Sequence, residues 1–348
     1  MTRRKVRIGI IGAGENTRRK HLPNLQKIDG VEVAAVCNRR RESTKAVAEA
    51  FGIPRACAHW SEIVGMDDVD AVVIGTWPYL HCEATCAALA AGKHVLCEAR
   101  MAMNAREAHR MLDALRRTTL VGQIVPSPVG LRGHAVMVDL LAQDYVGRPC
   151  EVCVRSFSAA WLDPNEPMHW RQDEHLSGLN VLTLGIFNET VQRWLGDTTA
   201  VQASARNFVP ERTDPVSGER RPVRIPDSIA VLAAMECGAR AVYHMSGAAM
   251  AGGEQRIEIY GSRGVLHYLA DTDRILGCQA GETALTEMPI GAQDARGWTV
   301  EEDFIASIRR GKRVELTSFE DGVKYMEFTE AAHLAAAGGC AVALPLRL

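Results

Sequence analysis

The sequence predicts an α/β protein of two domains: an N-terminal domain on a mostly parallel, doubly wound sheet, and a C-terminal α+β domain with an open, mostly antiparallel sheet. Three observations predict this fold class. The chain has 348 residues, enough for two domains of ordinary size. Short apolar runs alternate with amphipathic segments up to residue 124, and from residue 125 several alternating, β-rich stretches follow one another. We therefore expect domains over residues 1–124 and 125–348.

The N-terminal domain is expected to alternate strands with helices. Its strands are apolar, β-rich runs bounded by Gly, Asp or Lys, at residues 6–11, 31–37, 71–76, 94–98 and 120–124. Helices are expected between them at 18–28, 42–51, 80–91 and 105–116, and in the first of these Leu22, Leu25 and Ile28 fall on one face. This alternation is typical of βαβ units, which build a parallel sheet.

The alternation ends where Pro126, Pro128 and Gly130 break the pattern, so the second domain begins there. After a helix at 135–142, its open sheet is expected to contain the β-rich stretches 151–157, 201–208, 229–235, 241–245, 257–260 and 265–268. Helices should cover one face of this sheet, and they are expected at 181–194 and, as a C-terminal pair, at 299–310 and 319–337. The alternative for the C-terminal pair is that it packs back on the first domain. The segment 210–226 has no apolar period and is expected to be a long exposed loop or hairpin tip.

Composition and charge exclude several classes of protein. With 40 basic and 42 acidic residues the formal net charge is -2, so the chain offers no general field for nucleic acid or an anionic membrane. No apolar stretch approaches the roughly 20 residues that span a bilayer, and the apolar run after the basic N-terminus is too short for a secretion signal. We expect a cytoplasmic protein that binds a small-molecule substrate and whose 10 scattered cysteines are reduced and mostly buried.

The cysteines do not predict a metal site. Cys150 and Cys153 have metal-ligand spacing, but they fall in a predicted strand, where side chains at odd spacing point to opposite faces, and no second Cys/His pair lies at zinc-finger distance. Cys82 and Cys86 share one face of a predicted helix. Buried core packing is the preferred interpretation of this pair, and a nucleophilic Cys82 beside His81 is the weaker alternative.

A glycine-rich turn predicts a dinucleotide site. Gly12-Ala13-Gly14 directly follows the first strand and opens the first helix. The first glycine permits a tight turn, the second lets the backbone approach a pyrophosphate, and the helix N-terminus offers it unpaired N–H groups. The third position of the pattern is Thr17 instead of glycine, which we expect to loosen only the packing of helix on strand. These features predict a Rossmann domain; the alternative is that glycine merely suits a strand-to-helix turn.

The end of the second strand indicates which dinucleotide binds. Sites specific for NAD usually carry a carboxylate there for the ribose 2'-hydroxyl, whereas this chain has Asn38 followed by arginines at 39–41. A neutral Asn beside guanidinium groups does not repel a 2'-phosphate, and Arg pairs with phosphate bidentately. NADP(H) is therefore expected, with NAD as the alternative cofactor. The other interpretation is that the arginines simply begin a solvated helix.

These segments, with several downstream motifs, resemble the Gfo/Idh/MocA family of NAD(P)-dependent oxidoreductases. The resemblance covers nearly the whole chain and depends on motifs in a fixed order: the glycine turn with His21-Leu22-Pro23, residues 76–81 and 91–98, Trp170-Arg171 ahead of Ser177-Gly178, and residues 259–264 and 338–345. It implies an N-terminal Rossmann domain and a C-terminal domain whose open sheet supports a homodimer or homotetramer. It also implies a sugar, polyol or other small carbonyl or alcohol substrate held between the domains. We expect cofactor contacts from Gly12, Gly14, Glu15, Asn16, Asn38, Arg39, Arg40, Thr76, His81 and Glu98.

The chain departs from the catalytic pattern of that family. Members typically carry Glu-Lys-Pro after the fifth strand, where this chain has Glu98-Ala99-Arg100. In the helix after Trp170-Arg171 the family usually shows Asp, Gly and His, and the matching positions here are Thr183, Gly185 and Phe187. An Asn and an Arg of the family are also missing from residues 122–126. Substrate contacts are expected from Trp170, Arg171, Thr183 and Phe187.

These changes leave open which group moves the proton, because hydride transfer between an alcohol and a carbonyl needs an acid or a base. Arg100 stays protonated, so it can polarise an oxygen but can hardly exchange a proton. His175 and Glu189 are the candidate replacements, and the alternative is that both are ordinary surface or capping residues. We expect an NADP(H)-dependent oxidoreductase with atypical catalytic residues Arg100, His175 and Glu189. The other hypothesis is a cofactor-binding member without net redox activity: a lyase, an NAD-dependent glycosidase-like enzyme or a sensor.

Overall fold

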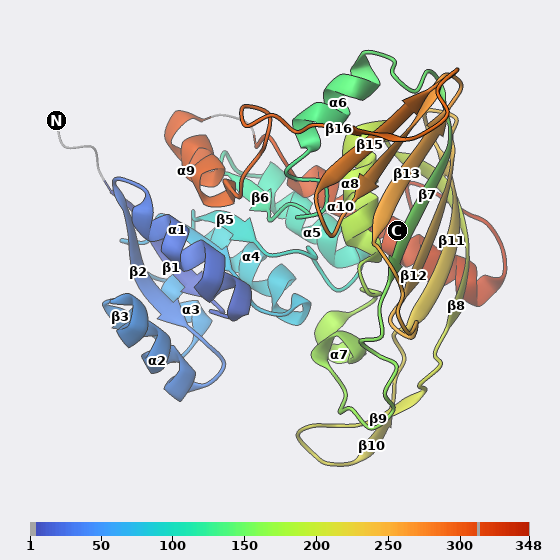
Figure 1. The fold of residues 1–348 in the computed structure, drawn as a ribbon. Helices are drawn as coiled ribbons and strands as arrows, with labels where there is room; N and C mark the ends of the chain where they lie inside the picture. Colours follow the sequence, from blue (N-terminus) through green and yellow to red (C-terminus); the bar gives the residue numbers. More distant parts are fainter. Residues whose placement is uncertain (1–4, 312–313, 348) are drawn as a thin grey trace. The chain divides into compact units, whose positions relative to one another are not determined.

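A computed structural model describes residues 5–311 and 314–347 (Figure 1). The described residues form two compact units. Unit 1 comprises those within Met1–Pro126 and Thr299–Val323, and unit 2 comprises those within Ser127–Trp298 and Lys324–Leu348. Residues 299–323 therefore group with the N-terminal part of the chain.

Unit 1 contains a parallel sheet. Its described residues form six strands in the order β3-β2-β1-β4-β5-β6, and every neighbouring pair is parallel. The strands are β1 (Val6–Ile11), β2 (Val31–Cys37), β3 (Arg55–Ala56), β4 (Ala71–Ile74), β5 (His94–Cys97) and β6 (Gly122–Ile124). The order reverses between β1 and β4, and ligands of open α/β sheets bind at the carboxyl edge beside such a switch point. The prediction of a doubly wound N-terminal domain is confirmed.

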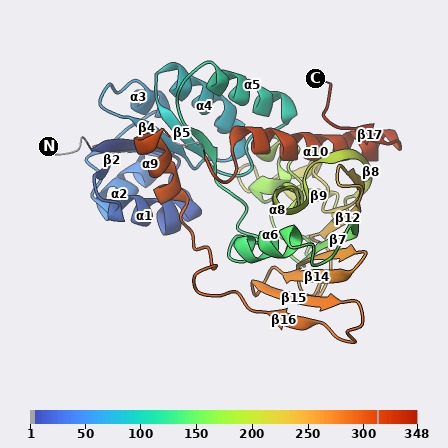
Figure 2. The same ribbon diagram turned by 90° about the horizontal axis from the view of Figure 1, so that it is seen from above.

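Helices cover both faces of this sheet. Figure 2 shows α4 (His81–Ala90) and α5 (Ala105–Arg116) on one face, and α1 (Leu22–Lys27) and α9 (Val300–Arg310) on the other. A π-helical segment, η1 (Thr17–His21), precedes α1, and the remaining helices are α2 (Arg41–Phe51), α3 (Trp60–Val64) and the short η2 (Pro78–Leu80). Because the sheet is covered on both faces, all four residues of β4 are buried, which explains the unbroken apolar runs of the sequence.

Unit 2 contains a mixed, mostly antiparallel sheet, as predicted. Its described residues form nine strands in the order β16-β15-β14-β13-β7-β12-β11-β8-β17, in which only β7 and β12 pair in parallel. The strands are β7 (Pro149–Phe157), β8 (Thr198–Arg206), β11 (Ser228–Met235), β12 (Arg240–Ser246), β13 (Arg256–Gly261), β14 (Gly264–Leu269), β15 (Arg274–Gln279), β16 (Thr286–Met288) and β17 (Val342–Ala343).

One face of this second sheet carries the core of unit 2. Apolar side chains of α8 (Leu184–Leu195) and α10 (Phe319–Gly338) pack on inward-facing strand residues such as Val152, Tyr243 and Ile257. The other helices are α6 (His134–Ala142), η3 (Trp170–Gln172) and α7 (Glu174–Ser177). Along β11 and β12 buried and exposed residues alternate, so the opposite face of the sheet is open.

Some elements differ from the sequence prediction. Strands β3, β15, β16 and β17 and helix α3 were not predicted, because most of them are too short to show a period. Residues 210–226 contain a hairpin of β9 (Glu211–Thr213) and β10 (Arg220–Pro222), one of the two forms expected for that segment. Among the described residues no helix is both long and apolar enough to cross a membrane.

Candidate functional site

The glycine turn lies at the carboxyl edge of the unit 1 sheet, between the end of β1 and a helical segment that continues into η1. Gly12 has φ +87°, and a Cβ there would lie 2.7 Å from the backbone nitrogen of Thr76. No other residue fits this position without moving Gly75 and Thr76, the two residues directly after β4. A Cβ at Gly14 would meet nothing nearer than the carbonyl oxygen of Gly75, at 3.6 Å. Gly14, Glu15 and Asn16 are exposed, so the turn presents backbone to a ligand at the start of a helix.

Thr17 at the third glycine position does not loosen the packing of the helix, and that prediction was wrong. The Thr17 side chain is buried, and its hydroxyl donates to the carbonyl oxygen of Gly12 over 3.1 Å. The room for it comes from Gly75, where a Cβ would lie 2.1 Å from Thr17 Oγ1 and 2.4 Å from the Gly12 oxygen. The glycine that allows close approach is therefore on the neighbouring strand end instead of the helix. Sequence reasoning missed Gly75, because the predicted strand 71–76 included it, whereas in the structure β4 ends at Ile74.

Asn38, at the end of β2, helps to hold the glycine turn. The side-chain Oδ1 of Asn38 accepts a hydrogen bond from the backbone N–H of Ala13 over 2.6 Å, and the backbone N–H of Asn38 donates to Thr44 Oγ1. The Asn38 side chain is therefore adjacent to the turn, at the position where NAD-specific sites carry a carboxylate. No carboxylate stands at residues 38–41 in this chain.

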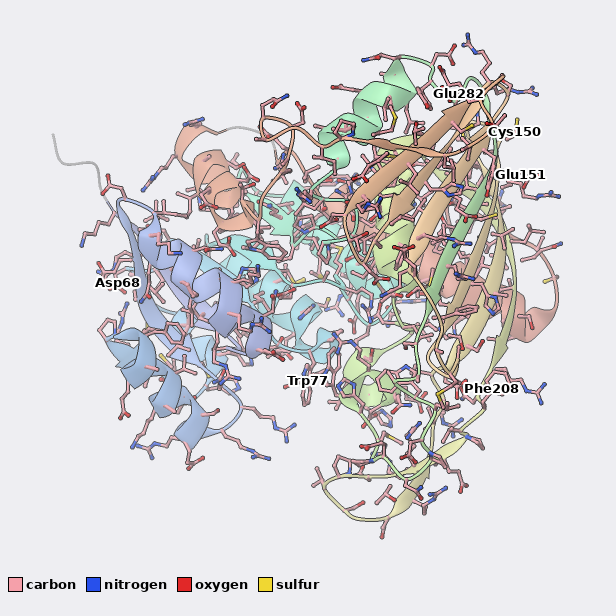
Figure 3. All side chains as sticks on the ribbon, viewed as in Figure 1. Asp68, Trp77, Cys150, Glu151, Phe208 and Glu282 are labelled. Carbon is pink, nitrogen blue, oxygen red and sulfur yellow. The ribbon has the colours of Figure 1, made fainter. Side chains whose placement is uncertain are left out.

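The arginines after Asn38 are exposed, and one of them pairs with an aromatic ring. The guanidinium of Arg39 lies over the Trp77 ring, 5.9 Å from its centroid. Trp77 is on the loop that follows β4 (Figure 3). Arg39 and Trp77 thus bring the ends of β2 and β4 together on either side of the glycine turn, and Arg40 precedes α2 as its N-cap residue.

Glu98, directly after β5, belongs to a buried ionic cluster. Its Oε1 lies 3.0 Å from His21 Nε2, its Oε2 accepts from the N–H of Ala99 over 3.1 Å, and Asn16 Nδ2 donates to Oε1. On the other side of the imidazole, His21 Nδ1 lies 2.5 Å from Glu301 Oε1, a residue of α9. The cluster thereby joins the glycine-turn helix to the end of β5 and to a segment far along the chain.

The charges in this cluster follow from burial and pairing. Burial lowers the pKa of His21, but the hydrogen bonds to the Glu301 and Glu98 carboxylates outweigh it and raise that pKa to about 9. For Glu98, burial raises the pKa, but the interactions with the His21 imidazolium and the Asn16 amide outweigh burial, so the net pKa lies below its usual value. An imidazolium between two carboxylates leaves one net negative charge beside the start of the helix.

His81 and Arg100 lie at the same edge of the sheet. His81 is buried, with Nε2 3.0 Å from the carbonyl oxygen of Thr76 and Nδ1 3.0 Å from that of Arg100. Burial lowers the pKa of His81. Both ring nitrogens therefore face the backbone, and His81 holds the loop after β4 against the segment after β5. Arg100 has a largely buried side chain two residues beyond Glu98.

The remaining predicted site residues belong to unit 2. The guanidinium of Arg171 lies 4.3 Å from the centroid of the Trp170 ring, in η3. His175 is exposed in α7, and its backbone N–H donates to Asp173 Oδ1 over 2.9 Å. Thr183, the residue before α8, donates from its hydroxyl to Ser156 Oγ over 3.0 Å.

Two of the unit 2 predictions are assigned other roles by the structure. Phe187 is completely buried and belongs to the hydrophobic core of unit 2, so its role is packing. Glu189 is 2% exposed; one carboxylate oxygen lies 3.1 Å from Arg193 Nε, and the other accepts from the N–H of Ser127 over 3.1 Å. A carboxylate held by a buried ion pair in this way is a structural group. Apart from the i, i+4 spacing, no sequence pattern indicates Arg193 as the partner of Glu189.

Two family models match consecutive parts of the chain. One, described as an oxidoreductase family with an NAD-binding Rossmann fold, matches residues 6–124, and the other, described as the GFO/IDH/MocA C-terminal domain, matches residues 134–267. Together with the glycine turn at the switch point of the sheet, the first match defines the class: oxidoreductases with an NAD-binding Rossmann fold. Both matches specify one family within that class. The chain belongs to the Gfo/Idh/MocA family, which confirms the resemblance predicted from its motifs.

Curated relatives match parts of the chain. An uncharacterized oxidoreductase of Rhizobium meliloti, ORF334, is 29% identical over 61% of this chain and 61% of its own length. A 1,5-anhydro-D-fructose reductase of Ensifer adhaerens is 34% identical over 51% of this chain and 52% of its own length. A levoglucosan dehydrogenase of Pseudarthrobacter phenanthrenivorans is 28% identical over 49% of this chain and 44% of its own length. The matches thus span about half of these relatives.

Solved structures resemble the chain along its whole length. An oxidoreductase domain protein from Kribbella flavida superposes with a TM-score of 0.88 at 24% identity, covering 99% of this chain and 100% of that one. A levoglucosan dehydrogenase in complex with NADH and L-sorbose gives a TM-score of 0.87 at 22% identity, covering 98% and 99%. At 22–24% sequence identity, the similarity to these two structures shows that the chain has the same fold and nothing more.

Proposed function

We propose that this chain is an NADP(H)-dependent oxidoreductase that moves a hydride to or from a carbon of a sugar, a polyol or another small carbonyl or alcohol. A bound nicotinamide cofactor supplies or accepts that hydride. The observation that carries the proposal is the turn at Gly12, where close packing requires glycine and the exposed Gly14 and Glu15 open a helix. The backbone of this turn would hold the pyrophosphate.

The preference for NADP(H) is supported by the groups at the ends of β2 and β4. Asn38 is neutral, and the Arg39 guanidinium lies over the Trp77 ring beside the glycine turn. A guanidinium at this position can pair with a 2'-phosphate through two parallel hydrogen bonds. NADH, by contrast, offers Arg39 only a ribose hydroxyl.

Titration of NADPH and NADH followed by fluorescence tests the cofactor preference. We expect tighter binding of NADPH, and Arg39→Ala should weaken it by about 10- to 100-fold with little effect on NADH, because a hydrogen-bonded ion pair is lost. Lys45→Ala, an exposed lysine of α2, is the matched control for loss of one positive charge. Equal affinity for the two dinucleotides in the wild type would contradict the NADP(H) assignment.

The substrate class is supported by names that the relatives carry. They include the 1,5-anhydro-D-fructose reductase and levoglucosan dehydrogenase above and an inositol 2-dehydrogenase of Acidiphilium cryptum, 31% identical over 60% of this chain. All three names describe redox chemistry, so the non-redox hypothesis gains no support from them. A panel of sugars and polyols with NADP+, and of the corresponding carbonyls with NADPH, tests the class through absorbance of the reduced cofactor.

For the proton, we assign the acid/base role to His175 and a polarising role to Arg100. We do not assign it to Glu189, because the buried Glu189 carboxylate pairs with Arg193, whereas the His175 imidazole is exposed. His175→Gln should lower kcat by about 100-fold or more and remove one limb of its pH profile, because a positioned acid or base contributes that much. Unchanged kcat and pH profile would remove His175 from the mechanism.

We also propose that the protein forms a homodimer or homotetramer through the open face of the unit 2 sheet. Leu232 and Val242, register partners on β11 and β12, are 41% and 37% exposed on that face. Light scattering on the wild type should give a multiple of the chain mass, and Leu232→Arg should reduce it. Val216→Arg, at a position 85% exposed in the segment between β9 and β10, is the control.

A further inference from the structure

The β9–β10 hairpin of unit 2 lies beside the segment 161–177 of the same unit (Figure 1). The backbones meet where the N–H of Met168 donates to the carbonyl oxygen of Thr213 over 2.8 Å. The segment contains three of the predicted site residues, namely Trp170, Arg171 and His175. What holds this segment in place therefore bears on the proposed reaction.

The segment has little helical stability of its own. The helices η3 and α7 have three and four residues, and isolated helices shorter than about 12–15 residues are marginal in water. Asp173 joins the two helices. Its N–H donates to the carbonyl oxygen of Trp170 over 3.3 Å at the end of η3, and its Oδ1 accepts from the N–H of His175 over 2.9 Å at the start of α7. The orientation of α7 relative to η3 thus depends on the groups that hold Asp173.

Arg221 of β10 connects Asp173 to the hairpin. Its Nη1 lies 3.5 Å from Asp173 Oδ2 and 2.5 Å from Asp214 Oδ2, and these two carboxylate side chains are only 15% and 13% exposed. Asp214 is itself fixed, because its Oδ1 accepts from the N–H groups of Val216 and Ser217 over 2.7 and 3.0 Å. The N–H of Ser217, the Arg221 guanidinium and the N–H of Val216 lower the pKa of Asp214 to about 2, so the carboxylate stays charged.

Two further arginines connect the hairpin region to the segment. Arg212 of β9 is 1% exposed and donates to the carbonyl oxygens of Asp163 and Glu166 over 2.7 and 2.9 Å. Arg224, just after β10, lies with its Nε 3.0 Å from Glu174 Oε1, but both side chains are exposed and such a pair contributes little. The segment is thus held before η3 by a buried guanidinium, and at the joint between η3 and α7 mainly by the contacts of Asp173.

We propose that Arg221 is a positioning residue for the hydride transfer of the proposed function, on which this inference rests. Through Asp173, Arg221 fixes the start of α7 and holds His175 where it serves as acid or base. A misplacement of about 1 Å can cost about 100-fold in rate. Arg221→Ala should therefore lower kcat by about 10-fold or more. Both limbs of the pH profile should remain, because His175 is still present, and the Kd for NADPH should stay the same, because the glycine turn belongs to unit 1.

Two more variants separate positioning from general damage to the fold. Arg221→Lys keeps the charge and should recover part of kcat. Asp214→Asn should lower kcat in the same direction as Arg221→Ala, because Arg221 loses its charged partner in the hairpin. Arg220→Ala is the matched control, since the Arg220 guanidinium pairs with Glu211 inside the hairpin. Urea unfolding shows that each variant is folded under assay conditions. An unchanged kcat in Arg221→Ala, or an equal fall in Arg220→Ala, would overturn the proposal.

Amide hydrogen exchange of the full chain, followed by mass spectrometry, tests the link without any enzyme assay. Peptides covering residues 173–178 should exchange faster in Arg221→Ala than in the wild type and in Arg220→Ala. Unchanged exchange there would overturn the inference even if kcat fell. If His175→Gln lowers kcat and Arg221→Ala does not, the inference fails and the proposed function stands. A wild type without dehydrogenase activity would instead overturn the proposed function, and faster exchange in Arg221→Ala would still show that Arg221 holds α7.

Discussion

His21 and Glu301 are separated by 280 residues in the chain, yet His21 Nδ1 and Glu301 Oε1 lie 2.5 Å apart in unit 1. Neither side chain is exposed, and the opposite ring nitrogen of His21 faces Glu98. Asn24 Nδ2 adds a hydrogen bond of 3.1 Å to the second oxygen of Glu301. The ion pair between His21 and Glu301 therefore links the start of α9 to the helical segment that follows the glycine turn. This ion pair exists only while the His21 imidazole is protonated.

The stability of unit 1 should depend on the protonation of His21. Its pKa is about 9 in the folded chain against 6.5 for an ordinary histidine, so the contribution of the cluster is complete below about pH 6.5 and is lost as the pH rises through about 9. His21→Gln leaves two buried carboxylates without a cation, which should cost on the order of 3 kcal/mol near pH 6. Urea unfolding of wild type and variant at pH 6 and pH 9.5 measures this. The difference between them should shrink at pH 9.5; a constant difference would mean that His21 contributes by packing alone.

Gly75 should prove as necessary to the glycine turn as the glycines of the motif. Gly75→Ala places a Cβ 2.1 Å from Thr17 Oγ1 and 2.4 Å from the carbonyl oxygen of Gly12. We expect a loss of about 1–3 kcal/mol in unfolding free energy and weaker dinucleotide binding, because the turn must move. Gly65→Ala is the matched control, since a Cβ there meets nothing nearer than 3.4 Å. A Gly75→Ala protein that binds the dinucleotide like the wild type would show that the turn adapts without cost.

Asn38→Asp should shift the cofactor preference without disturbing the turn. An Asp oxygen can still accept the hydrogen bond that Asn38 Oδ1 now accepts from the N–H of Ala13. Its negative charge repels a 2'-phosphate and can accept from a ribose hydroxyl. The Kd for NADPH should rise by about tenfold or more, while that for NADH should stay the same or fall. If both constants rise together, Asn38 acts only through the turn.

Glu189→Gln separates a structural role from a catalytic one. The buried carboxylate pairs with Arg193, whose Nη2 also donates to the carbonyl oxygen of Val129 over 3.1 Å. Removing one charge of a buried pair typically costs about 3–5 kcal/mol, so the unfolding midpoint should fall markedly. Below the new midpoint, the pH profile of kcat should keep its shape. A lost limb in that profile with unchanged stability would restore Glu189 as an acid/base candidate.

Several features of the site could be predicted because they are local. The need for glycine at Gly12 follows from a backbone turn of three residues, and the absence of a carboxylate at residues 38–41 is visible in the sequence itself. Other roles depend on partners that no local pattern indicates. The sequence made Glu189 a candidate acid/base group, but Arg193 and the N–H of Ser127 hold its carboxylate in the fold. Thr17 was expected to loosen the packing of its helix, but Gly75 on the neighbouring strand end leaves room for its side chain.

By itself, the sequence determined the alternation of strands and helices in unit 1, the glycine turn and the family, because periodicity, backbone conformation and ordered motifs are properties of neighbouring residues. Only the tertiary structure decided which ionisable side chains pair with one another. The buried imidazole of His21 takes its charge from Glu98 and Glu301, which lie 77 and 280 residues away. Electrostatic interactions act over a few ångströms in space, whatever the separation along the chain, so only the folded arrangement fixes them.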